Sequence, residues 1–225
     1  MTQNNNNDLL KDVNVCNNSL AIHNLSVLRD KDTPPEIFKV ATKRLAYLIL
    51  SDAVKDLPLK AIKVMTPLEE ADAQILSPDY EIIIAPILRA ALTLSQVLED
   101  LLPTAKVYHI GLYRDEETLK PVRYYNKLPE KLSNPSKTKV FVLDPMFATG
   151  GSAIEAVNIF KELGIPEENI CFVSLIAAPE GIHKFRKFHK QVKLVTGVVD
   201  KRLNDKGYIM PGLGDAGDRT FNTVK

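Results

Sequence analysis

The sequence has little net charge, few cysteines and no long apolar run. Lysine and arginine number 29 and aspartate and glutamate 28, and the resulting net charge of +1 argues against a dedicated nucleic-acid-binding protein. The two cysteines, Cys16 and Cys171, lie far apart, and we expect them to be reduced and structural. No stretch approaches the roughly 20 apolar residues that span a bilayer, and the N-terminus does not resemble a secretion signal. We therefore expect a cytoplasmic protein without a membrane partner.

Several common site motifs are also missing from the sequence. No GxxxxGK[ST] occurs and no GxGxxG follows an expected strand, which disfavours a P-loop nucleotidase and a Rossmann dehydrogenase. No HxxxH or HExxH spacing occurs, so we do not expect a zinc site. The basic stretch HKFRKFHK, residues 183–190, fits an amphipathic helix with a solvated basic face better than an RNA contact.

The composition and the apolar pattern are those of an α/β domain. Hydrophobic residues make up 45% of the 225 residues and charged residues 25%, as in ordinary globular proteins. Apolar runs of strand length alternate with segments of helical period, which predicts a central, mainly parallel sheet flanked by helices. The expected strands are 80–87, 106–113, 139–144, 169–178 and 192–200. We predict a disordered, Asn-rich tail over residues 1–20 and a single domain over residues 21–225.

Two helix starts carry end signals. Thr33-Pro34-Pro35-Glu36 has the form of a capping box with proline at the first helical position. Ser152 and Glu155 form a second box, whose helix should end near Gly164. Between them, residues 114–140 are rich in charge and proline, which predicts a surface loop or a mobile arm.

The stretch DPMFATGGS, residues 144–152, places an aspartate at the end of an apolar strand and a turn of glycine and hydroxyl residues before a helix. At the carboxyl end of a parallel strand, such a turn points backbone N–H groups at an anion. The glycines allow close approach, Thr149 and Ser152 add donors, and Asp144 can accept from ribose hydroxyls or hold a metal ion or its waters. The stretch predicts a ribose-phosphate site, and the alternative is a tight turn in which Ser152 merely caps the helix.

With three further segments, this stretch resembles the uracil phosphoribosyltransferases, a family of type I phosphoribosyltransferases. The segments are VFVLDPMFATGGSA (140–153), APILRAAL (85–92), GLYRDEETLKPVRYYNKLP (111–129) and GYIMPGLGDAGDRTF (207–221). Asp144 is followed by Pro145, as in the uracil enzymes, whereas many other relatives have two adjacent acids there. The resemblance extends from about residue 23 to the end of the chain.

The resemblance implies a type I phosphoribosyltransferase fold with an extended arm and a C-terminal hood over the base. It implies a pentosyltransferase that joins uracil to 5-phosphoribosyl 1-diphosphate (PRPP), giving uridine 5′-monophosphate (UMP) and diphosphate for pyrimidine salvage. Mg²⁺ is the implied cofactor, held mainly through PRPP and through water on Asp144 or Asp215. The residues expected to bind PRPP are Arg89, Arg114, Asp144, Pro145, Met146, Phe147, Ala148, Thr149, Gly150, Gly151, Ser152 and Asp215.

The residues expected to act in catalysis are Arg89, Arg114, Asp144 and Asp215. Arg89 and Arg114 each end an expected strand, where a planar guanidinium can bind diphosphate oxygens in a bidentate way. A surface arginine is the alternative for Arg89. The resemblance also implies a non-proline cis peptide beside Arg89. Ala91 stands where the family usually has glycine, so its Cβ either crowds the ligand or packs on the sheet.

The C-terminal segment 207–221 is rich in glycine and has little apolar bulk, which predicts a loop with exposed backbone groups. The resemblance implies that Tyr208, Ile209, Gly214, Asp215 and Ala216 bind uracil. Backbone donors and acceptors that match uracil would reject cytosine, because buried polar groups would be left unpaired.

The resemblance further implies a homodimer or homotetramer and, as in some relatives, a GTP effector. Three other interpretations of the same motifs are an RNA-binding regulator on the same fold, a catalytically silent nucleotide-binding domain and a purine enzyme.

Overall fold

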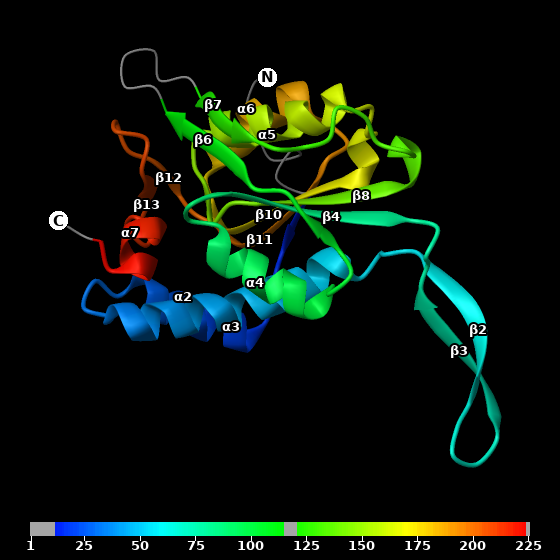
Figure 1. Ribbon diagram of the computed structural model, residues 1–225. Helices are drawn as coiled ribbons and strands as arrows, with labels where there is room; N and C mark the ends of the chain where they lie inside the picture. The colour runs from blue at the N-terminus through cyan, green and yellow to red at the C-terminus, as the bar shows by residue number, and fades with distance from the viewer. Residues whose placement is uncertain (1–11, 115–120, 224–225) are drawn as a thin grey trace, which may run out of the picture.

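The computed structural model of the protein describes residues 12–114 and 121–223. In these residues the chain forms a nine-stranded sheet, in which seven strands lie in the order β1-β11-β10-β8-β4-β6-β7 (Figure 1). Every strand pair in this sheet is parallel except β6 with β7, and the short strands β5 and β9 pair with β4 and β10. The strands are β1 (Val13–Val15), β4 (Glu81–Leu88), β5 (Lys106–Val107), β6 (Ile110–Arg114), β7 (Pro121–Asn126), β8 (Thr138–Leu143), β9 (Met146–Phe147), β10 (Ile170–Ala177) and β11 (Lys193–Val199).

The expected α/β class and mainly parallel sheet are confirmed. Four of the five expected strands agree with β4, β8, β10 and β11 to within one residue at each end. The fifth, 106–113, is divided into β5 and β6, which follow one another along β4. Tyr108 and His109 lie between the two, so the apolar run alone did not reveal the break.

Helices cover both faces of the sheet. The helices α2 (Ser19–Arg29), α3 (Pro35–Val54) and α4 (Leu92–Leu101) lie on one face, and α5 (Gly151–Glu162) and α6 (Pro179–Phe188) lie on the other (Figure 1). The short helix α7 (Ala216–Phe221) packs beside α3. No helix of the described residues is both long and apolar enough to cross a membrane.

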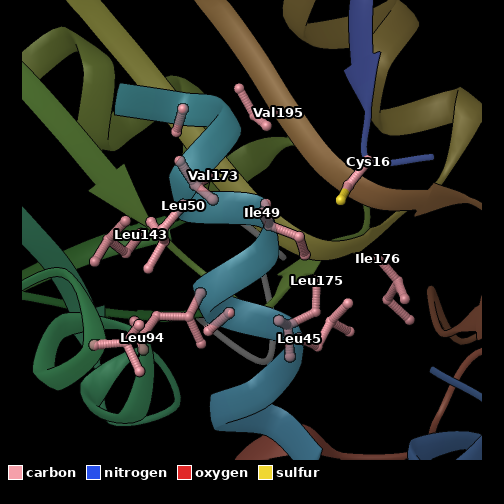
Figure 2. Close-up of a cluster of buried hydrophobic side chains, with 14 of the residues drawn as sticks. Cys16, Leu45, Ile49, Leu50, Leu94, Leu143, Val173, Leu175, Ile176 and Val195 are labelled. Atoms are coloured by element: carbon pink, nitrogen blue, oxygen red, sulfur yellow. The ribbon is translucent and has the colours of Figure 1, made fainter. Parts of the chain in front are cut away.

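Successive side chains of the central strands point to opposite faces of the sheet and are buried in two separate cores. Ile84 and Leu143 enter the core beneath α3, whereas Ile83 and Val142 enter the core beneath α5. In the first core, Leu45 and Ile49 of α3 lie against strand residues such as Val173, Leu175 and Val195 (Figure 2). Each fully buried side chain of this kind contributes about 1.5–3 kcal/mol. This double burial explains why the strands have continuous apolar sequences.

The expected disordered tail is wrong for residues 12–20. β1 extends the sheet beside β11, Cys16 N–H donates to the Thr196 carbonyl at 2.9 Å, and α2 begins at Ser19. A three-residue strand such as β1 is too short to give a recognisable apolar pattern, and its partner β11 lies far away in the sequence. Residues 1–11 lie outside the described residues.

Both expected capping boxes are wrong in detail. The Thr33 hydroxyl donates to the Val27 carbonyl at 2.7 Å, and Pro34 occupies the N-cap position without a side-chain bond. α5 begins one residue before Ser152, after Gly150 in a left-handed conformation with φ 75°. The turn geometry sets the start of α5, and Ser152 falls in its first turn. Its expected end is confirmed, because Gly164 follows the C-cap with φ 83°.

The projecting arm is formed by another segment than the one expected. β2 (Leu59–Met65) and β3 (Glu70–Leu76) form an antiparallel hairpin that extends away from the body of the protein (Figure 1). Residues of both hairpin faces are exposed, so the hairpin shows no buried apolar face. Within the expected arm, β7 instead joins the sheet beside β6, and residues 115–120 lie outside the described residues.

The basic segment in α6 is amphipathic as expected, but its basic residues do not all face the solvent. Lys184 and Lys187 are exposed, whereas Arg186 is buried and donates to the Val192 carbonyl at 2.6 Å. His189 is buried against Glu167, with 3.1 Å between Nδ1 and Oε1. Arg186 and His189 of the expected basic face are therefore structural.

Candidate functional site

The expected site residues gather at the carboxyl edge of the parallel sheet. Arg89 follows β4, Arg114 ends β6 and Asp144 follows β8. The C-terminal segment covers this edge with a small hairpin of β12 (Arg202–Leu203) and β13 (Ile209–Met210), followed by α7. Ligand sites of open α/β sheets lie at this edge, where adjacent loops diverge.

Residues 144–152, the phosphate loop, surround a small cavity of about 60 Å³. The end of β10 holds the loop in place: Leu175 N–H donates to the Pro145 carbonyl at 3.1 Å, and Ala178 N–H donates to the Phe147 carbonyl at 2.8 Å. Pro145 does not line the cavity. The lining residues are Asp144, Met146, Phe147, Ala148, Thr149, Gly150, Gly151, Ser152, Ala153 and Phe172. Eight of the nine residues of the phosphate loop therefore surround one anion-sized space at the start of α5.

Gly181, in the first turn of α6, packs against the back of the phosphate loop. A Cβ at this position would lie 2.0 Å from the Ala148 carbonyl oxygen and 3.1 Å from the Gly150 nitrogen. In the reverse direction, a Cβ on Gly150 would lie 2.7 Å from the Gly181 carbonyl oxygen. Sequence reasoning missed Gly181, because the contact joins two glycines far apart in the chain.

A second, larger cavity of about 320 Å³ adjoins the first. All five residues expected to bind the base line it, namely Tyr208, Ile209, Gly214, Asp215 and Ala216. Asp144, Met146 and Ala148 line both cavities. The lining also includes residues that were not predicted, namely Ala90, Lys206, Gly207 and Gly217. Lys206 had no distinguishing signal, since it is one of several charged residues in a turn.

Residues 207–221, the base loop, are built from tightly bonded turns. The Asn204 side chain accepts from the N–H groups of Lys206 at 3.0 Å and Tyr208 at 2.9 Å. Asp215 caps α7 by accepting from Asp218 N–H at 2.9 Å, and Gly214 before it has φ 80°. Ile209 is buried in the core beneath α3, which docks this segment on the body of the protein.

Asp144 and Asp215 present two carboxyl groups to the larger cavity. The pKa of Asp144 is raised to about 7, chiefly by burial and also by the neighbouring Asp215 carboxylate, while the Met146 N–H that donates to Asp144 at 3.2 Å opposes the shift. The ionised form of Asp144 is therefore stabilised most by a ligand that supplies a positive charge or hydroxyl donors.

Arg89 and Ala91 lie at the start of α4. The expected cis peptide is confirmed between Leu88 and Arg89. The Arg89 side chain is 64% exposed, lies 3.7 Å from the Asp218 carboxylate, and lines neither cavity. Ala91 is fully buried in the core with φ −80°, a conformation open to any residue, so its Cβ packs against the core instead of entering the cavity.

The backbone of Arg114 ends β6 at the same sheet edge, but its side chain lies outside the described residues. The hairpin that carries it is anchored, because Arg123 of β7 pairs with Glu162 of α5 at 2.9 Å and with Glu155. Arg114 is thus connected to the helix that begins at the phosphate loop.

Comparison with known proteins shows which family the chain belongs to. A family model for uracil phosphoribosyltransferase matches residues 15–223. A uracil phosphoribosyltransferase from Dictyoglomus thermophilum is 49% identical over 209 residues, covering 93% of this chain and 98% of the relative. One from Bacillus velezensis is 44% identical over 211 residues, covering 94% and 98%.

Among solved structures, a protein from Aquifex aeolicus matches with a TM-score of 0.83 at 37% identity, covering 93% of this chain and 97% of that one. The matches to the family model, to the two relatives and to the Aquifex aeolicus structure all extend over nearly the whole chain. The protein therefore belongs to the uracil phosphoribosyltransferase family.

Proposed function

We propose that the protein transfers the 5-phosphoribosyl group of PRPP to N1 of uracil, giving UMP and diphosphate. The observation that carries this proposal is the pair of adjoining cavities, which share Asp144, Met146 and Ala148. The smaller one suits the 5-phosphate, because backbone N–H groups at a helix start attract an anion. The larger one, at about 320 Å³, has a volume in the range of small-molecule sites and suits the ribose and the base.

Base recognition falls to the backbone of the base loop. Ile209, Gly214 and Ala216 line the larger cavity together with Tyr208, and their main-chain groups are proposed to meet the base. Uracil offers two carbonyl acceptors and an N–H donor along one edge, which a rigid loop can match. Cytosine would face a donor with a donor, and sites that rely on buried hydrogen bonds reject such analogues by about 10⁴-fold.

Arg89 and Arg114 are proposed to bind the diphosphate. Arg89 is exposed and only loosely paired, so its guanidinium can turn toward a ligand at low cost. Positive charge at the departing diphosphate stabilises the charge that develops in the transition state. Asp215 is proposed to contact a ribose hydroxyl, and assistance in removing the uracil N1 proton is its alternative role. Positioning and electrostatics then carry the transfer through an oxocarbenium-like state.

Mg²⁺ is the expected cofactor, and the donor set fits it. Asp144 and Asp215 offer carboxylate oxygens on one cavity wall, and no group of three or more metal-ligating side chains gathers in residues 12–114 and 121–223. Mg²⁺ is typically held by one or two carboxylates together with substrate phosphates and waters. We propose that the two aspartates hold it through water alongside PRPP, where the bound ion would neutralise diphosphate charge.

The β2–β3 hairpin supports assembly as a homodimer or homotetramer. Met65 and Leu68 at its tip are 77% and 94% exposed, and further apolar side chains, Leu59, Ile75 and Leu76, are exposed along it. A projecting arm with this surface suits a second copy of the chain. The GTP effector and the cytoplasmic location stay predictions.

The test is a chromatographic assay of the purified protein with PRPP, Mg²⁺ and either uracil, cytosine or hypoxanthine, with and without GTP. We expect UMP from uracil and no nucleotide from the other two bases. Nucleotide formed from hypoxanthine would indicate a purine enzyme. PRPP binding without any product would indicate a silent domain or a regulator.

A further inference from the structure

The C-terminal end of α2 holds the base loop from behind. Arg29, the last residue of α2, donates from Nη2 to Oδ1 of Asp200 at 2.5 Å and from Nη1 to Oδ2 at 3.0 Å. Asp200 directly follows β11, and its side chain is only 4% exposed. A bidentate pair of this kind fixes orientation as well as distance. Neither residue lines the cavities described above.

The Arg29–Asp200 pair encloses the backbone of Gly212. The Gly212 N–H donates to Oδ2 of Asp200 at 3.0 Å, and its carbonyl accepts from Nη1 of Arg29 at 3.0 Å. A Cβ on Gly212, which has φ 65°, would lie 2.2 Å from the Ile209 carbonyl oxygen, so the turn is closed tightly. Ile209 and Gly214, on either side of Gly212, line the larger cavity. Holding Gly212 therefore sets where both of these residues lie.

A second arginine reinforces this attachment. Arg219 of α7 donates to the carbonyls of Asp30 at 2.6 Å and Leu213 at 2.7 Å, and also to that of Leu28. Its guanidinium carbon lies 4.3 Å from the centroid of the Phe38 ring in α3. The phosphate loop has a different support, since it is bonded to the end of β10. The two loops can thus be disturbed separately.

We infer that Arg29 and Asp200 are positioning residues for the base, which keep the backbone groups of the base loop in the geometry that distinguishes uracil from cytosine. This inference rests on the proposed binding of uracil by that loop. The two side chains act through Gly212 and touch no substrate. Loosening them weakens uracil binding and relaxes the rejection of cytosine, because rejection depends on donors and acceptors that cannot move to suit the wrong base.

The test compares steady-state kinetics of Arg29→Met, Arg29→Lys, Asp200→Asn and the Arg29→Met/Asp200→Asn double variant. A lost charge-assisted hydrogen bond is worth about tenfold or more in binding, so we expect KM for uracil to rise about tenfold in Arg29→Met and Asp200→Asn. KM for PRPP should change less than about twofold, and the ratio of kcat/KM for uracil to that for cytosine should fall about tenfold. Arg29→Lys should restore part of both effects.

The double variant should lose less than the product of the single effects, because both substitutions remove the same interaction. The matched control is Lys193→Met at the opposite end of β11, which removes a 2.7 Å ion pair with Asp56 away from both cavities. We expect this variant to keep the KM for uracil and the selectivity of the unmodified protein.

An unmodified protein that makes no UMP from uracil would overturn the proposed function itself. If the unmodified protein is active but Arg29→Met and Asp200→Asn keep its KM for uracil and its selectivity, the positioning role is wrong. Equal increases in both KM values would also overturn it, since they indicate a general structural role. If Asp200→Asn does not fold, the comparison of Arg29→Met with Arg29→Lys decides the question.

Discussion

The contact between Gly181 and the phosphate loop predicts that Gly181→Ala impairs the use of PRPP. The added Cβ would lie 2.0 Å from the Ala148 carbonyl oxygen. Non-bonded heavy atoms at rest are about 3.5 Å apart, so the loop or the start of α6 must move by roughly 1.5 Å. The Ala148 carbonyl belongs to the backbone and cannot rotate away as a flexible side chain could. The substitution therefore changes the shape of the phosphate cavity.

The expected size of the effect follows from this displacement. A shift of about 1 Å in a positioning element can cost about 100-fold in rate, so kcat/KM for PRPP should fall about 100-fold. The free energy of unfolding should fall by only about 1–3 kcal/mol, as for other overpacked sites. The assay measures initial rates of UMP formation at varied PRPP and saturating uracil, together with chemical denaturation.

The matched control is Gly164→Ala, after the end of α5. Gly164 has φ 83°, and a Cβ there would lie 3.6 Å from Pro135, so the cost is left-handed backbone strain of about 1–2 kcal/mol without a clash. We expect this control to lose stability and keep its kcat/KM for PRPP. If Gly181→Ala also loses stability alone, with unchanged kcat/KM, the contact does not shape the phosphate site.

Three other predictions concern different parts of the protein. Arg219→Met removes three hydrogen bonds to backbone carbonyls and the contact with Phe38, and should lower the free energy of unfolding by about 2 kcal/mol in chemical denaturation. A loss below about 0.5 kcal/mol would contradict the role of Arg219 in holding the base loop. The pKa of Asp144 is raised from 3.8 to about 7, so between these pH values the folded state holds a proton that the unfolded state has lost. As the pH rises through this range, the free energy of unfolding should therefore decrease by up to about 1 kcal/mol per pH unit, and above it the decrease should level off. Asp144→Asn should abolish that decrease in denaturation curves measured across this range, and a decrease that persists in the variant would assign it to another group. Replacing both Met65 and Leu68 by glutamate should convert the proposed oligomer to a folded monomer in light scattering, because both side chains are exposed in the single chain, and an unchanged molar mass would exclude the hairpin tip from the interface.

Local sequence patterns were sufficient for much of the sheet and for one of the two loops. Residues 139–144 and 169–178 are continuous apolar runs, and each is a central strand because both of its faces are covered by helices. The stretch 144–152 combined a strand end, glycines and hydroxyl residues within nine positions, so its role as a turn around an anion-sized cavity was readable locally. The capping box at Ser152 failed because the left-handed turn at Gly150 sets the helix start, and the box at Thr33 failed because Pro34 takes the N-cap position.

The sequence by itself determined the α/β class, the succession of strands and helices along the chain, and the loop of residues 144–152 at the carboxyl edge of the sheet. These features depend on residues that are neighbours in the chain, where periodicity and turn chemistry act. Only the tertiary structure decided how the loops are supported: Gly181 lies against Ala148, and Arg29 pairs with Asp200 across 171 positions. Such contacts arise where separate elements meet in the folded chain, and a glycine or an arginine carries no local mark of the distant partner that it will contact.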